Sequence, residues 1–124
     1  MRLLRAGRRG ARPLNCGVRR HEMITAQIQR LWTDHRQDTF PASARGRDVC
    51  GIDLVLLDSL AAGCIDAFVN TDDVLDQPKL ALLEDLVVQL RDILPFLELG
   101  EREYFERLQR LAQAVLTNAP GRAG

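Results

Sequence analysis

The chain has 124 residues, of which 46% are hydrophobic and 27% are charged, and its formal net charge is zero. This composition excludes a largely disordered chain, and the length predicts one domain with a hydrophobic core of its own. Leucine dominates the hydrophobic residues, whereas aromatic and β-branched residues are few, which argues against an all-β fold.

The zero net charge hides an uneven distribution. Residues 1–20 hold seven arginines and no acidic residue, so residues 21–124 carry ten basic and 17 acidic side chains, a net charge of −7. We expect residues 1–20 to be a disordered basic arm without function, or a translated stretch upstream of a start at Met23. An arm that binds nucleic acid or acidic surfaces, and a targeting segment, are the alternatives. The acidic domain itself is not typical of a nucleic-acid-binding core.

The cysteines and the most apolar segment bear on where the protein resides. Cys16, Cys50 and Cys64 are an odd number and show no disulfide framework, which favours a reducing, cytoplasmic environment. Residues 52–69 are the most apolar part of the chain but include three aspartates. Because each carboxylate costs about 3 kcal/mol at the centre of a bilayer, we expect no membrane span.

The first element in chain order is a helix predicted over residues 22–36. Its apolar positions follow a 3.6-residue period and include His35, which we expect to be a partly buried structural histidine rather than a metal ligand. A loop is predicted over residues 37–51, because a Phe-Pro pair and two glycines interrupt the pattern. Residues 43–48 within it are expected to be solvated.

The second predicted helix, residues 53–69, is apolar on most of its sides, so we expect it in the middle of the packing. Asp53 occupies the position of an N-cap. Ser59, Gly63 and Ala67 recur every four residues, and small side chains at this spacing allow another helix to approach closely. We expect that helix to belong to the same chain, and a homodimer seam is the alternative.

Part of this segment, DLVLLDSLAAGCID at residues 53–66, resembles the phosphoacceptor strand and following loop of response-regulator receiver domains. The resemblance implies a phosphorylated Asp58 at the end of a strand. The rest of the chain departs from that family, because no acidic pair follows an N-terminal strand and the sole lysine, Lys79, lies in a different place. We therefore interpret the segment as a leucine-rich buried helix.

Two amphipathic helices are predicted to follow, over residues 76–94 and 100–116. The first opens on an Asp-Gln-Pro start and ends before Pro95, and the second has apolar residues on one face and ion pairs at i,i+4 spacing on the other. The sequence thus predicts an all-α fold, a compact bundle of about four helices over residues 21–118. Residues 119–124 are expected to form a disordered tail.

The connection between these two helices, residues 94–99, is almost wholly apolar where polar residues are expected. We expect it to tuck under the bundle, and the alternative is that it presents Phe96 and Leu97 to a partner. With the stripe of small residues, this gives the predicted interaction surface: Ser59, Gly63, Ala67, Phe96 and Leu97.

The sequence predicts no catalytic residue, metal site or cofactor. Residues 70–76 are acidic but lack the alternating ligands of a calcium loop, and no phosphate-binding loop or nucleophile motif is present. We expect a non-catalytic protein–protein interaction or self-associating module whose partner is a protein or a second copy. A nucleic-acid-associated protein using the arm is one alternative. An enzyme is another, and a cleft holding His35 beside Asp58 or Asp66 would favour it.

Overall fold

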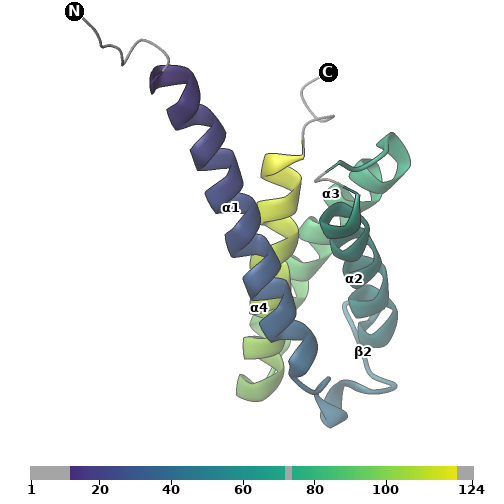
Figure 1. Ribbon diagram of the computed structural model, residues 1–124. Coiled ribbons are helices and arrows are strands. Elements are labelled where there is room, and N and C mark those ends of the chain that lie inside the picture. The colour runs from purple at the N-terminus through teal and green to yellow at the C-terminus, as the bar shows by residue number, and fades with distance from the viewer. Residues whose placement is uncertain (1–11, 72–73, 120–124) are drawn as a thin grey trace, which may run out of the picture.

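The protein's structure, a computed structural model, describes residues 12–71 and 74–119. Within these residues four helices pack against one another (Figure 1), which confirms the predicted all-α bundle. The predicted disordered arm and tail fall in part outside the described residues, at 1–11 and 120–124. The helices are α1 (Arg12–Gln37), α2 (Leu54–Asn70), α3 (Gln77–Ile93) and α4 (Leu99–Asn118).

Helix α1 begins at Arg12, earlier than the start predicted at residue 22. Its N-terminal part extends beyond the other helices, and its C-terminal part lies along α4 (Figure 1). There Ile28, Trp32 and His35 are buried, as the 3.6-residue period predicts for one face of the helix.

The connection from α1 to α2 is more structured than predicted. It contains a 3-10 turn (Ala42–Ala44) and a small antiparallel hairpin of β2 (Asp48–Val49) and β3 (Ile52–Asp53). The two residues of the hairpin turn have φ angles of 53° and 76°, because such turns require left-handed backbone. The expectation that residues 43–48 are solvated is wrong for Ala44, which is fully buried, and for Arg47, which is half-buried.

Polar caps fix the starts of α2 and α3 as the sequence predicts. Asp53 accepts hydrogen bonds from the backbone N–H groups of Val55 (2.9 Å) and Leu56 (3.3 Å), and Asp76 accepts one from Lys79 (2.9 Å). Strand β3 ends at Asp53, so Asp58 lies inside a helix. The phosphoacceptor strand that the receiver resemblance implies is therefore not formed.

Helix α4 is the centre of the bundle, since it packs against α1, α2 and α3. A capping box between Glu98 and Glu101 starts it, and one broad face is buried along its whole length. Helix α2 also packs against the three other helices, as predicted for a helix in the middle of the packing, but its outer side is left open. No helix within the described residues has the length and hydropathy needed to span a membrane.

Candidate interaction surface

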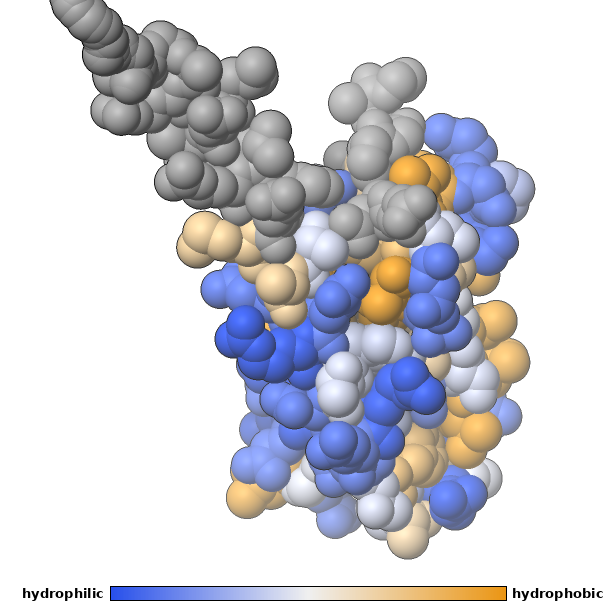
Figure 2. Space-filling model, in the orientation of Figure 1, coloured by the Kyte–Doolittle hydropathy of each residue, from blue (hydrophilic) through white to orange (hydrophobic). Residues whose placement is uncertain are grey.

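The outer side of α2 exposes large hydrophobic side chains. Leu56 is 55% exposed and Leu60 is 37% exposed, whereas Leu57 and Ala61 on the opposite side are buried. Ser59, which lies between the two leucines in the chain, and Gly63, which follows them, are exposed as well. Figure 2 shows hydrophobic residues along the side of the molecule where α2 lies. We call the exposed residues of this helix the α2 outer face; it comprises Val55, Leu56, Ser59, Leu60, Gly63, the half-buried Ala67, and Asn70.

The α2 outer face carries no charge, because the aspartates of the helix turn inward. Asp58 accepts a hydrogen bond from the Tyr104 hydroxyl of α4 (2.8 Å). Asp66 accepts one from the Trp32 Nε1–H of α1 (3.4 Å). Residues 52–78 contain no basic residue, so α2 adds no positive charge to this face, and Lys79 of α3 lies beside Ala67 at its C-terminal end. The result is a neutral, partly apolar strip on a domain of net negative charge.

A shallow groove borders the N-terminal half of this strip. Its volume is about 220 Å³, and α3 contributes Gln89 to its lining. The other lining residues come from the hairpin and from α2: Gly51, Ile52, Asp53, Leu56, Leu57 and Leu60. The two exposed leucines therefore stand beside a depression, which is the surface shape that a protruding side chain of a partner can use.

Within the described residues no second helix covers Ser59 or Gly63, whereas Ala67 is half-buried and packs in part against the core. A Cβ atom built on Gly63 meets nothing within 4 Å, and both Gly63 and Ser59 are exposed. The predicted crossing within the chain is therefore wrong at this point. Gly63 lies mid-helix, where glycine weakens a helix, and the part of the chain that the structure describes gives it no packing reason.

Gly63→Ala should stabilise the isolated chain. The added methyl group has open space around it, and alanine favours the helix over glycine by about 1 kcal/mol. The expected result is a rise of about 0.5–1 kcal/mol in the free energy of unfolding, measured by urea denaturation at low protein concentration. A loss of stability would show that the α2 outer face is covered within the chain.

The apolar connection after α3 divides between the two predicted arrangements. Leu97 is 3% exposed and packs into the core, so it is not part of a surface, and its place among the predicted interaction residues is wrong. Phe96 is 62% exposed and stands at the end of a 3-10 turn (Leu94–Phe96). The sequence does not predict which of Phe96 and Leu97 is buried, because the side chains of an irregular connection follow no fixed period.

A polar cluster joins α1 to α4. Arg107 of α4 donates from Nε to His35 Nδ1 (3.0 Å) and pairs through Nη2 with Asp38. His35 is buried and packs against the Tyr104 ring, with 4.4 Å between the ring centroids. Burial and the neighbouring guanidinium of Arg107 lower the pKa of His35 to about 4, against the weaker opposing effect of Asp38. The predicted structural role of His35 agrees with this packing.

This histidine makes stability depend on pH. Its pKa is about 4 in the folded protein and 6.5 in an unfolded chain, so unfolding takes up a proton between these limits. We expect the free energy of unfolding to fall as pH drops from 6.5 to 4, by at most about 1.4 kcal/mol per pH unit for this single proton. Urea denaturation across this range measures the slope. The variant His35→Gln keeps the carboxylates of Asp38 and Asp58 and loses only the imidazole. The difference in slope between wild type and this variant therefore belongs to His35. An unchanged slope would contradict it.

Two of the groups considered for an enzyme meet at Tyr104, which is buried and whose side chain also lines a pocket. Tyr104 contacts His35 with its ring and Asp58 with its hydroxyl, which links two of the three residues whose meeting in a cleft would favour an enzyme. Burial raises the pKa of Asp58 against the opposing hydrogen bond from Tyr104, and burial together with Asp58 raises that of Tyr104. Both pKa shifts follow mainly from burial. The contacts of Tyr104 with His35 and Asp58 stabilise the junction of α1, α2 and α4.

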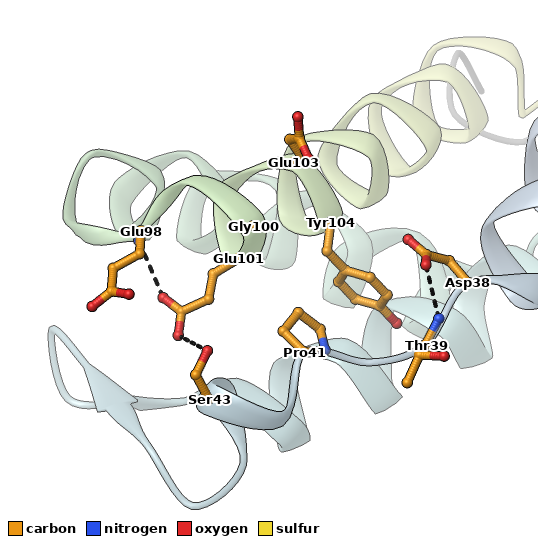
Figure 3. A pocket seen from close by; sticks show the side chains of 9 residues that line it. All are labelled: Asp38, Thr39, Pro41, Ser43, Glu98, Gly100, Glu101, Glu103 and Tyr104. Atoms are coloured by element: carbon orange, nitrogen blue, oxygen red, sulfur yellow. Dashed lines mark hydrogen bonds between the residues drawn. The ribbon is translucent and has the colours of Figure 1, made fainter.

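An acidic pocket of about 440 Å³ lies between the start of α4 and the segment after α1 (Figure 3). Glu101 at its wall is 2% exposed and accepts hydrogen bonds from Ser43 Oγ (2.6 Å) and the Glu98 backbone (3.2 Å). It also pairs with Arg47 Nη1. Burial raises the pKa of Glu101, but the hydrogen bonds from Ser43, Arg47 and Glu98 outweigh it and hold that pKa below its ordinary value. The buried carboxylate is thus engaged in fastening the α1–α2 connection to α4.

Among the residues that the structure describes, no group of three or more His, Cys, Asp or Glu side chains is arranged to hold a metal ion. Comparison with protein-family models, with curated proteins and with solved structures found no match. The surface and its chemistry are therefore the basis for assigning a function.

Proposed function

We propose that the protein is a non-catalytic interaction module that binds a protein through the α2 outer face. The observation that carries this proposal is the exposure of Leu56 and Leu60 on a helix whose aspartates are turned inward. Exposed apolar strips rimmed by polar residues are typical of protein-binding surfaces.

The charge of the domain supports the same surface. Residues 21–124 carry a net charge of −7, and stripping water from charged groups opposes association. The neutral α2 outer face is where another protein can dock without that cost.

We propose a cytoplasmic location for the module. The exposed free thiol of Cys50 supports this proposal, because free thiols are typical of reducing compartments.

Photo-cross-linking tests the proposal. A photoreactive amino acid replaces Leu60 in the full chain, and a matched chain carries it at Gln113, an exposed polar position of α4. In cells that produce the protein, we expect adducts with protein from position 60 and few from position 113. Mass spectrometry of the adducts shows whether the captured protein is a second copy or another chain. Equal labelling at both positions, or none at position 60, would overturn the proposal.

A further inference from the structure

A regular seam begins at the charged N-cap residue of α2, Asp53, and continues along the α2 outer face. Asp53, Leu56, Leu60, Gly63, Ala67 and Asn70 follow one another at spacings of three, four, three, four and three residues. This is the heptad spacing by which one helix packs along another. Five of the six are exposed, and Ala67 is half-buried and packs in part against the core, so the described residues leave most of the seam uncovered.

The seam is complementary to itself in one orientation. Its first half carries the large residues Leu56 and Leu60, and its second half carries the small residues Gly63 and Ala67. When two copies of α2 run antiparallel about a two-fold axis between residues 61 and 62, each leucine faces a small residue. Interiors are close-packed, so this fit of large against small favours the arrangement.

Specifically, Leu56 then faces Ala67 of the second copy, and Leu60 faces Gly63. The polar ends fit as well, because Asp53 faces Asn70, whose side-chain amide can donate to the carboxylate. A parallel pairing would place leucine against leucine and glycine against glycine, which crowds one end and leaves a gap at the other.

We propose that the protein forms a two-fold symmetric dimer in which the α2 helices of two copies pack antiparallel along this seam. The inference rests on the proposed function and names the partner of the same surface. A second copy is favoured over another protein because the seam supplies both halves of the fit. The centre of the seam also has no exposed charge, so nothing there attracts a partner of opposite charge.

Analytical ultracentrifugation of the full chain tests the dimer. Wild type should shift from monomer to dimer as concentration rises. Gly63→Glu should raise the dissociation constant at least about tenfold, because the new side chain occupies the space that Leu60 of the other copy needs. The matched variant Gln113→Glu adds the same charge on α4 and should leave the constant unchanged. Circular dichroism should show that both variants keep the helical content of wild type.

Disulfide cross-linking tests the orientation. Two chains are prepared with Cys16 and Cys50 replaced by serine, one with Leu56→Cys and one with Ala67→Cys. Residues 56 and 67 lie about 16 Å apart along a helix, so neither chain can cross-link to itself in the antiparallel dimer. A mixture of the two should give a disulfide-linked heterodimer on mild oxidation, whereas each chain alone should not.

Each outcome decides between the alternatives. A disulfide dimer of the Leu56→Cys chain alone indicates parallel packing and overturns the inference, as does a dimer that Gly63→Glu leaves intact. A wild-type chain that stays monomeric at every concentration also overturns it. If such a chain still gives position-60 adducts with another protein in cells, the proposed function stands without the dimer; if it gives none, both are overturned.

Discussion

Phe105→Ala should lower the free energy of unfolding by about 3–5 kcal/mol. Phe105 is fully buried on α4, the helix against which the other three pack. Its ring lies edge-on to those of Tyr104 and Phe40, at centroid distances of 5.3 and 6.0 Å. The substitution removes these contacts and leaves a cavity where the α1–α2 connection meets the core. A domain of this size is stabilised by about 5–15 kcal/mol in total, so the loss is a large fraction.

Phe96→Ala is the matched control, since it removes the same side chain from an exposed position of the same bundle. We expect it to change the free energy of unfolding by less than about 0.5 kcal/mol. Urea denaturation followed by circular dichroism measures both variants. A small effect of Phe105→Ala, or equal effects of the two, would contradict the assignment of α4 as the centre of the core.

Arg47→Met should lower the free energy of unfolding by about 2–4 kcal/mol, because it leaves the buried Glu101 carboxylate without its cation. Ser43 and the Glu98 backbone still donate to the carboxylate, which limits the loss. The methionine keeps the apolar length of the arginine stem, and the change removes the charge together with the hydrogen bond from Arg47 Nη2 to the Phe96 carbonyl (3.3 Å). Urea denaturation at neutral pH measures the loss.

A second substitution and a change of pH separate charge from packing. Glu101→Gln in the Arg47→Met background removes the unpaired charge and keeps an oxygen that accepts from Ser43, so it should recover part of the loss. In wild type the pKa of Glu101 is below its ordinary value, so that its stabilising effect is lost as pH falls. In Arg47→Met the same pKa should rise, and acidification to about pH 5 should narrow the gap to wild type. A double variant as unstable as the single one would show that the guanidinium acts through packing.

The outer face of α2 links the local chemistry of the fold to the proposed function. Tyr104 and Trp32 each hold one aspartate of α2 on the inner side, and the outer side is neutral as a consequence. The polar contacts that fasten α2 to α4 and α1 therefore also prepare the surface that we propose for binding.

The sequence by itself determined the four helices, because periodicity and capping act over a few residues. Asp53 and Asp76 cap their helices as predicted, and the apolar faces of α3 and α4 are buried as the 3–4 spacing indicates. The heptad positions of the α2 seam are also visible in the sequence, although its leucines were assigned to the core. When a helix is apolar on most of its sides, its sequence does not predict which side will be buried.

Only the tertiary structure shows which side of α2 is covered and which polar residues pair in the interior. Arg47 and Glu101 are 54 positions apart, and Arg107 and His35 are 72 apart, so neither contact leaves a trace in local spacing. Residues 43–48 looked solvated for the same reason, since the residue that pairs with Arg47 lies on α4. Which face of α2 remains open depends on how many helices can pack around α4, and this is a property of the assembled bundle rather than of any one segment.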